Sequence, residues 1–253
     1  MGSSSAASVT AVIAAAGSGQ RLGAGGPKAF VPLAGRRMVE WSIAAFRASD
    51  SVRSIVVACP PGHVHDLAGS DLGVVDGGAT RTRSVANGLA AVGTELVAIH
   101  DAARPLVTPE LIEGVVATLI ADPDADGAIA ATPVTDTIKR CNALDTQEGY
   151  KTLHWVEETV DRGRLWAAQT PQVFRVEALR HAFAGDPDRV ADATDEAMLI
   201  EAAGGRVLIH PSSTENVKVT TPLDLRLAEL LLAERSAQQD KGEGGGEADL
   251  ADA

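Results

Sequence analysis

A glycine-rich loop followed by two cations is the first segment of the chain whose residues could do chemistry. Gly17 and Gly19 come directly after a short apolar run, and Arg21 and Lys28 follow shortly after. Glycines let backbone N–H groups approach an anion closely. Two cations beside them suit a triphosphate, because negative charge grows on its bridging and leaving oxygens during transfer. The loop therefore predicts a triphosphate site; a glycine turn with solvated surface cations is the alternative interpretation.

Two familiar phosphate-binding loops do not fit this segment. A dinucleotide-binding loop needs its third glycine three residues after Gly19, but Leu22 stands there and Gly23 comes one place late. A Walker A loop needs a glycine before its lysine and a serine or threonine after it, whereas a proline precedes Lys28 and an alanine follows it. The sequence therefore predicts neither a dehydrogenase nor a P-loop enzyme.

Further polar motifs recur along the chain, and one of them directly follows a predicted strand, where open α/β sheets bind ligands. Singly they have structural explanations: Thr194 as a helix cap, Asp161 with Arg162 as a surface ion pair, and Lys218 as a solvated strand end. We expect His100 to be structural rather than a general base, and its surroundings do not predict a zinc site. The motifs are Asp76-Gly77-Gly78 before Arg81, Arg83 and Ser84; His100-Asp101-Ala102-Ala103-Arg104-Pro105; Asp136-Thr137; Asp161-Arg162; Thr170-Pro171-Gln172; Thr194-Asp195-Glu196-Ala197; and Asn216-Val217-Lys218-Val219-Thr220.

Short apolar runs alternate with helix-period segments, which indicates βα units and one mainly parallel sheet. Their near-continuous apolar character fits strands covered on both faces. Thr108-Pro109 and Thr221-Pro222 predict two helix starts, because threonine can cap a helix and proline suits its first position. The predicted strands are Ala11–Ala15, Ser54–Ala58, Leu96–Ile99, Gly127–Ala131, Val207–Ile209 and Val217–Val219.

The composition describes a globular protein and argues against several function classes. Of the 253 residues 45% are hydrophobic, and 34 acidic against 22 basic residues give a net charge of −12, the wrong sign for coating nucleic acid. Aromatic residues, at 3%, leave few rings for stacking bases. No apolar run approaches the roughly 20 residues of a membrane helix, and residues 1–8 lack the features of a signal peptide. Two distant cysteines, Cys59 and Cys141, indicate a reducing, cytoplasmic compartment.

Two segments depart from the α/β pattern. Residues 138–160 are polar around a β-prone patch at Leu153–Val156 and predict an excursion from the core, either an arm or a disordered surface loop. From Ser236 onward, low hydrophobicity with many glycines and acids predicts a disordered acidic tail over residues 236–253. One domain over residues 9–235 remains.

Taken together and in this order, the motifs resemble those of the 2-C-methyl-D-erythritol 4-phosphate cytidylyltransferase family of non-mevalonate isoprenoid biosynthesis. The resemblance spans about residues 10–234. The opening loop is shared with many sugar-phosphate nucleotidyltransferases, whereas HDAARP together with TDEA and the lysine of NVKVT is more specific. The resemblance implies a Rossmann-like nucleotidyltransferase fold, with a mainly parallel twisted sheet flanked by helices, a protruding dimerisation arm and a homodimer.

The resemblance also implies roles for individual residues. Arg21, Lys28 and Lys218 would flank the reacting phosphates and act in catalysis. The stretch between Arg140 and Asp161 is longer than the family pattern. The nucleotide would be held by Ala15, Ala16, Gly17, Ser18 and Gly19, with Asp76, Gly77 and Ser84 around cytosine and ribose. The polyol phosphate would be bound by Asp101, Arg104, Thr137, Arg162, Thr170 and Thr194, with Arg162 reaching into the partner subunit's site.

The implied reaction transfers a cytidylyl group from CTP to 2-C-methyl-D-erythritol 4-phosphate, giving 4-diphosphocytidyl-2-C-methyl-D-erythritol and pyrophosphate. A phosphate monoester has a second pKa near 6, so at pH 7 roughly nine molecules in ten are dianions that can attack the α-phosphorus in line without a protein base. Mg²⁺, implied by the resemblance, is expected mainly on triphosphate oxygens, and no metal-binding residue is assigned. The alternatives are a cytidylyltransferase for another polyol phosphate, such as ribitol 5-phosphate, and a non-catalytic nucleotide-binding module.

Overall fold

The centre of the molecule is a seven-stranded, mainly parallel sheet. The structure, a computed structural model, describes residues 8–17, 19, 22, 26–67, 71–143 and 154–243. The strand order is β11-β7-β10-β6-β1-β4-β5, and all neighbours are parallel except β10, which is antiparallel to β6 and β7. The strands are β1 (Val9–Ala14), β4 (Val52–Cys59), β5 (Gly73–Asp76), β6 (Leu96–Asp101), β7 (Gly127–Pro133), β10 (Trp166–Arg175) and β11 (Val207–Pro211).

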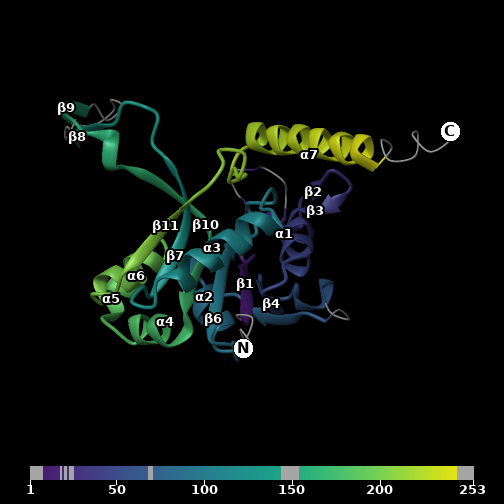
Figure 1. Cartoon of the computed structure of the whole chain (residues 1–253), viewed down its shortest axis with the longest axis horizontal. Helices are drawn as coiled ribbons and strands as arrows, with labels where there is room; N and C mark the ends of the chain where they lie inside the picture. The colour runs from purple at the N-terminus through teal and green to yellow at the C-terminus, as the bar shows by residue number, and fades with distance from the viewer. Residues whose placement is uncertain are drawn as a thin grey trace, which may run out of the picture.

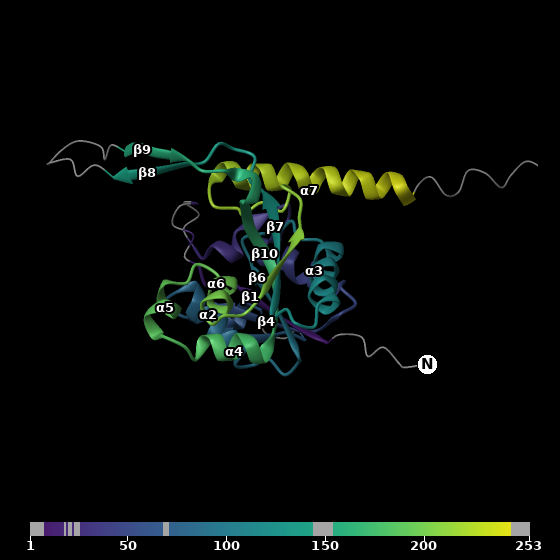
Figure 2. The same cartoon turned by 60° about the vertical axis from the view of Figure 1, so that its left-hand side comes forward.

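Helices cover both faces of this sheet (Figure 2). Successive side chains of β1 point to opposite faces, so that Ala11 and Ile13 belong to one buried cluster and Val12 to the other. This burial on both sides explains why the strands read as continuous apolar runs. The first cluster includes α1 (Met38–Arg47) and α3 (Pro109–Ala121); the second includes α2 (Arg81–Leu89), α4 (Val176–Phe183) and α6 (Glu196–Ala202), and α5 (Pro187–Asp192) lies on the same side.

Both helix starts predicted from Thr-Pro pairs are confirmed. The Thr108 hydroxyl accepts a hydrogen bond from the Leu111 N–H, and Pro109 is the first residue of α3. The last helix, α7 (Pro222–Glu243), begins at its proline. The predicted cap of α6 is one residue early: the Asp195 carboxylate, not the exposed Thr194, accepts from the Met198 N–H. Aspartate is at least as good a cap as threonine, so either residue fits the pattern.

Helix α7 lies across the end of the molecule where β1 and β6 finish (Figure 1). Ala228 and Leu232 are buried in a cluster with Leu33 and Val219. The helix extends to Glu243, so the predicted tail boundary at residue 236 is too early. Alanine, glutamine and lysine in this stretch are good helix formers and continue a helix that packing has already started. Residues 244–253 lie outside the described residues.

Five of the six predicted strands are present, and the sixth is wrong. Val217–Val219 is an extended segment without a strand ladder, tied to the sheet where the Val219 N–H donates to the Ala103 carbonyl at 2.8 Å. Strands β5 and β10 were not predicted; β10 contains Pro171, which argues against a strand in a sequence pattern. A short hairpin, β2 (Pro32–Leu33) with β3 (Arg36–Arg37), was also missed.

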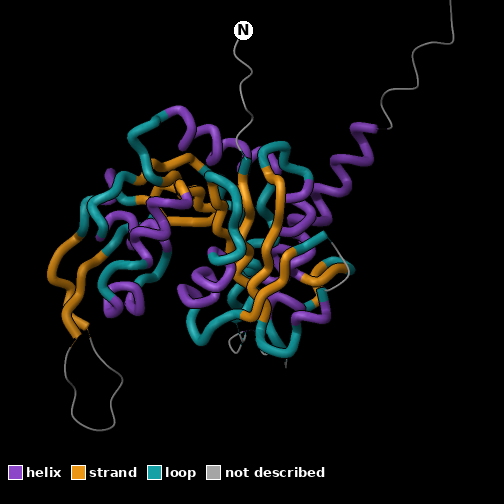
Figure 3. The backbone as a smooth tube through the Cα atoms, turned by 90° about the horizontal axis from the view of Figure 1, so that it is seen from below, coloured by secondary structure: helices purple, strands orange, loops and turns teal. Residues whose placement is uncertain are grey.

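The polar segment after β7 forms an arm. Strands β8 (Lys139–Ala143) and β9 (His154–Thr159) pair antiparallel in a separate two-stranded sheet. This hairpin projects from the body, on the opposite side from the end of α7 (Figures 1 and 3). On β9, Trp155 and Val156 are 65% and 59% exposed. Residues 144–153 lie outside the described residues.

One finding bears on membranes. None of the helices in the described part of the chain combines the length and the apolar character needed to cross a bilayer.

Candidate active site

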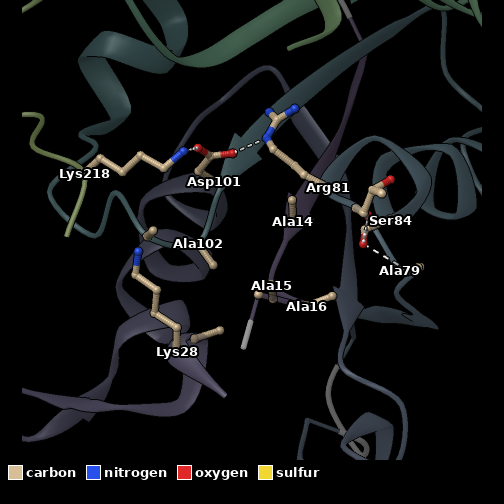
Figure 4. Close-up of a pocket in the computed structure, with 15 residues that line it drawn as sticks. Ala14, Ala15, Ala16, Lys28, Ala79, Arg81, Ser84, Asp101, Ala102 and Lys218 are labelled. Carbon is tan, nitrogen blue, oxygen red and sulfur yellow. Dashed lines mark hydrogen bonds and ion pairs between the residues drawn. The ribbon is translucent and has the colours of Figure 1, made fainter. Parts of the chain in front are cut away.

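A cavity of about 480 Å³ opens where β1 and β6 end (Figure 4). Its walls come from the loop after β1, the turn at Lys28–Phe30, the start of α2, the end of β6 and the segment that carries Lys218. This is the position at which open α/β sheets bind ligands. The lining residues are Ala14, Ala15, Ala16, Gly17, Lys28, Ala29, Gly78, Ala79, Thr80, Arg81, Ser84, Asp101, Ala102, Ala103 and Lys218.

The glycine-rich loop folds back on itself and carries Lys28 into the cavity wall. The Lys28 N–H donates to the Gly17 carbonyl at 3.2 Å. Gly19 has a φ of +66°, and a Cβ there would lie 2.8 Å from the Lys28 Cβ. Only glycine meets both conditions comfortably, so this residue allows the loop to close beside Lys28. Ser18 and Arg21, predicted for nucleotide binding and catalysis, lie outside the described residues.

Ser84 supports the opposite wall. Its buried hydroxyl accepts a hydrogen bond from the Gly78 N–H at 3.0 Å and donates to the Thr80 carbonyl at 2.9 Å. The hydroxyl therefore holds the turn from Gly78 to Thr80 in shape at the start of α2. Figure 4 shows Ala79 and Ser84 across the cavity from Lys28 and Lys218. Small residues, Gly78, Ala79 and Ser84, therefore face Lys28 and Lys218 across the cavity, and Arg81 lies on the same side as the small residues.

Asp76 and Gly77 are not among the described residues that line the cavity; the three residues that follow them are. The Asp76 carbonyl accepts a hydrogen bond from the Asn87 amide. Gly77 packs behind the wall, where its N–H donates to the Cys59 carbonyl at 2.6 Å. The predicted nucleotide motif is therefore in the right place, but the residues facing the cavity come slightly later in it.

Replacing Gly77 by alanine is expected to destabilise the fold by about 1–3 kcal/mol and to weaken CTP binding. The new Cβ would lie 2.3 Å from the Ala16 Cβ and 2.9 Å from the Cys59 carbonyl oxygen, and neither can rotate away. Denaturant unfolding and CTP titration measure the two effects. Gly93→Ala is the matched control, because a Cβ at Gly93 meets nothing within 4 Å. Equal stability and CTP affinity in the two variants would contradict the close packing of this wall.

A cluster of charged side chains closes the cavity near the end of β6. Asp101, which is 6% exposed, accepts from Arg81 Nε at 2.7 Å on one carboxylate oxygen and pairs with Lys218 Nζ at 2.7 Å on the other. Arg81 also donates through one terminal nitrogen to both oxygens of Glu196, each at 2.8 Å. Direct contacts thus connect four charged side chains, one each from α2, β6, α6 and the segment of Lys218.

The cluster keeps Arg81 and Asp101 in their charged forms. Burial by itself would raise the pKa of Asp101, but Arg81 and Lys218 outweigh burial and hold it well below its usual range. Burial would lower the pKa of Arg81, but Asp101 and Glu196 raise it above its usual range. A carboxylate has about four lone-pair positions, and Asp101 uses two of them here. Asp101 can therefore still accept hydrogen bonds from hydroxyl groups.

Two of the predicted polyol-binding residues, Thr170 and Arg104, do not belong to the described lining of the cavity but hold the segments beside it. The buried Thr170 hydroxyl accepts from the Asp101 N–H at 3.1 Å, and Arg104 donates to the Asn216 carbonyl at 2.6 Å. The Asn216 amide donates to the Thr170 carbonyl at 2.9 Å. These bonds join β6, β10 and the segment of Lys218. Thr170 and Arg104 thus position Asp101 and Lys218.

His100 is a structural residue, as expected. Its side chain is fully buried, its Nε2 lies 3.1 Å from the Arg104 carbonyl and its Nδ1 lies 3.0 Å from the Thr170 hydroxyl. Burial lowers the pKa of His100 to about 4, so the ring is neutral at pH 7. With both nitrogens engaged inside the protein, His100 is not placed to take a proton from a substrate.

Comparison with known proteins identifies the family. Residues 9–234 match the family IspD, 2-C-methyl-D-erythritol 4-phosphate cytidylyltransferase. The chain belongs to the IspD family.

Relatives and a solved structure agree with this assignment. Proteins named 2-C-methyl-D-erythritol 4-phosphate cytidylyltransferase from Parasynechococcus marenigrum and Rubrobacter xylanophilus are each 41% identical to this chain; they cover 90% and 89% of it and are themselves covered to 99% and 95%. The crystal structure of the Thermus thermophilus protein of that name superposes with a TM-score of 0.71 at 36% identity, covering 88% of this chain and 98% of that one. The predicted Rossmann-like nucleotidyltransferase fold is confirmed.

Three further residues predicted from the IspD pattern lie away from the cavity. Thr137, Arg162 and Thr194 are exposed and are not among the described residues that line it. The Arg162 guanidinium donates to the Thr135 carbonyl at the base of the arm. The predicted roles of these residues in binding the polyol phosphate remain predictions.

The cavity of this IspD-family chain fits a metal ion carried by the nucleotide better than one held by protein. Among the described residues, no group of three or more His, Cys, Asp or Glu side chains could hold a metal ion. Asp101 is the one carboxylate in the described lining, and a cation already occupies each of its oxygens. Mg²⁺ keeps several waters and binds readily to substrate phosphates, so few protein ligands are needed.

Sequence reasoning assigned no role to Arg81 or Glu196, although both stand inside quoted motifs. They are 115 residues apart, and only the fold brings them together. In the sequence, Arg81 and Glu196 are charged residues at helix starts within polar motifs. Charged residues at solvent-exposed helix starts give the same pattern, so the sequence does not reveal that the two side chains pair.

Proposed function

We propose that this cavity is where a cytidylyl group passes from CTP to 2-C-methyl-D-erythritol 4-phosphate, giving 4-diphosphocytidyl-2-C-methyl-D-erythritol and pyrophosphate. Membership of the IspD family provides the reaction. The observation that supports the site is the cavity itself, which combines Lys28 from the glycine loop with Lys218 and Asp101 at the end of β6. These cations suit two phosphorylated substrates that must meet.

The two walls suggest how CTP lies. The side with Lys28 and Lys218 suits the triphosphate, and the small residues Gly78, Ala79 and Ser84 on the opposite side suit the cytosine and ribose. Backbone N–H groups of the glycine loop would hold phosphate oxygens. Ala15, Ala16, Gly17, Ser18 and Gly19 make up that loop, and Arg21 joins the two lysines in the family pattern.

Asp101 is the acceptor for hydroxyl groups of the polyol phosphate in this proposal. Its two remaining lone-pair positions suit O–H donors, and Arg104 and Thr170 keep its backbone in place. We assign Thr137, Arg162 and Thr194 to the same subsite in a homodimer, in which the arm carries Arg162 to the partner's cavity. The exposed Trp155 and Val156 on the arm support an interface there, because large apolar groups gather at such surfaces.

The chemical step is in-line attack by the substrate phosphate on the α-phosphorus of CTP, with pyrophosphate leaving. The nucleophile is already a dianion at neutral pH, so the protein needs no general base. Its contribution is to hold two polyanions together and to stabilise charge on the transferred phosphoryl group and on pyrophosphate. Lys28, Lys218 and Arg21 perform this function.

Mg²⁺ bound to CTP would neutralise part of the triphosphate charge, and the triphosphate rather than the protein would supply most of its ligands. We also place the enzyme in the cytoplasm. Cys59 and Cys141 are free thiols, which supports a reducing compartment.

The test is pyrophosphate release by the purified chain with Mg²⁺ and CTP, supplying 2-C-methyl-D-erythritol 4-phosphate and ribitol 5-phosphate separately. UTP, ATP and GTP serve as controls. Release with CTP and methylerythritol phosphate is expected. Release with ribitol phosphate alone would keep the mechanism and overturn the substrate, and CTP binding without turnover of any pair would indicate a non-catalytic nucleotide-binding module.

A further inference from the structure

Four charged side chains form a line that runs from the protein interior to the cavity. In order they are Glu196, Arg81, Asp101 and Lys218, with carboxylates and cations alternating. Each contact in the line is between 2.7 and 2.8 Å. The last three residues line the cavity, and the first, Glu196, does not belong to its described lining. A change at Glu196 can therefore reach the cavity through Arg81.

Glu196 is placed for Arg81 and for no surface function. Its side chain has no exposed area, and both of its oxygens accept from the same terminal nitrogen of Arg81. A buried carboxylate is costly unless it is paired, and it is favoured here by its place in the first turn of α6. The pair therefore fixes one end of the Arg81 guanidinium.

The planar guanidinium transmits this fixed position to the cavity. With its terminal nitrogen bonded to Glu196, the Nε of Arg81 lies 2.7 Å from Asp101 Oδ1. Lys218 bonds the other oxygen, so the plane of the Asp101 carboxylate is held from both sides. The remaining lone pairs of Asp101 and the direction of the Lys218 ammonium are set together.

We propose that Glu196 is a positioning residue for the acceptor-phosphate subsite, acting through Arg81 to orient Asp101 and, through Asp101, Lys218. The inference rests on the proposed function, in which Asp101 accepts hydroxyl groups of the polyol phosphate. It predicts that a buried residue without substrate contact affects the KM for the polyol phosphate more than the binding of CTP, which depends mainly on the loop after β1 and on Lys28.

The test is Glu196→Gln, which keeps the shape and removes the charge. We expect the KM for methylerythritol phosphate to rise roughly tenfold and kcat to fall, because a charge-assisted bond to Arg81 is weakened. The CTP dissociation constant, from calorimetry without the second substrate, should change less than this KM, because Lys28 and the loop after β1 lie outside the line. Glu201→Gln is the matched control, which should keep wild-type kinetics: it makes the same substitution on the same helix at an exposed residue that lies outside the line.

A double-mutant cycle with Asp101→Asn separates positioning from a merely structural role. If Glu196 acts through Asp101, the two changes will be clearly less than additive in kcat/KM for the polyol phosphate. Additive effects, or a Glu196→Gln variant that loses only thermal stability, would overturn the inference. Full activity of Asp101→Asn alone would instead overturn the proposed role of Asp101. Should Glu196→Gln not fold, Glu196→Asp makes the same test, because it keeps the charge and withdraws the carboxylate by one methylene.

Discussion

Replacing Lys28 by alanine is expected to lower kcat for cytidylyl transfer by at least a hundred- to a thousandfold, the usual cost of one preorganised donor to a developing charge. Lys28 lines the cavity on the side of Asp101 and Lys218, and Gly17 and Gly19 hold its backbone in place. A group that acts on the transition state affects kcat even when both substrates are saturating. Pyrophosphate release under saturation measures this effect.

The matched control for Lys28→Ala is Arg53→Ala. Arg53 is exposed near the start of β4, at the opposite end of the sheet from the cavity, so its removal subtracts the same charge without touching the site. The control should retain wild-type kcat. A Lys28→Ala variant that folds and turns over at the wild-type rate would exclude Lys28 from transition-state stabilisation.

The second large effect is expected at Lys218. Lys218→Met removes the ammonium that pairs with Asp101 while keeping much of the side-chain length, and kcat should fall roughly a hundredfold or more. The change also leaves Asp101 with Arg81 as its remaining cation in the line, so the KM for methylerythritol phosphate should rise. Steady-state kinetics with each substrate varied in turn measure both constants. Unaltered kinetics with a lower melting temperature would make Lys218 a structural residue.

Much of the sheet could be predicted because its physical signal is local. The runs that became β1, β6, β7 and the second half of β4 are buried on both faces, and such strands are apolar at nearly every position. The edge strand β11 is only partly buried, but its run of Val207, Leu208 and Ile209 carries the same local signal. The prediction failed where the pattern was ambiguous. Val217–Val219 has two β-branched valines on either side of Lys218, which favours a strand, but Val219 is buried in a cluster with α7 rather than in a ladder. Strand β10 has Pro171 and polar neighbours, and partners on both sides override that composition.

The site could be predicted in outline but not in its internal connections. The loop, Lys28, Asp101 and Lys218 were expected to lie together, and the structure brings the described ones to one cavity. The hydrogen bonds of Thr170 and Arg104 beside the cavity depend on residues that are distant in sequence. The pairing of Arg81 with Glu196 does so too. No periodicity or spacing encodes such contacts, so only the fold shows them.

A structure of the chain with CTP and Mg²⁺ bound tests the location of the site most directly. The triphosphate should lie between Lys28 and Lys218, with the cytosine against the wall from Gly78 to Ser84. A second groove, of about 380 Å³ and lined in part by Trp166, Met198 and Ile209, is the alternative place for CTP to bind. CTP bound in that groove, or in the cavity with its phosphates away from both lysines, would contradict the proposed location of the active site.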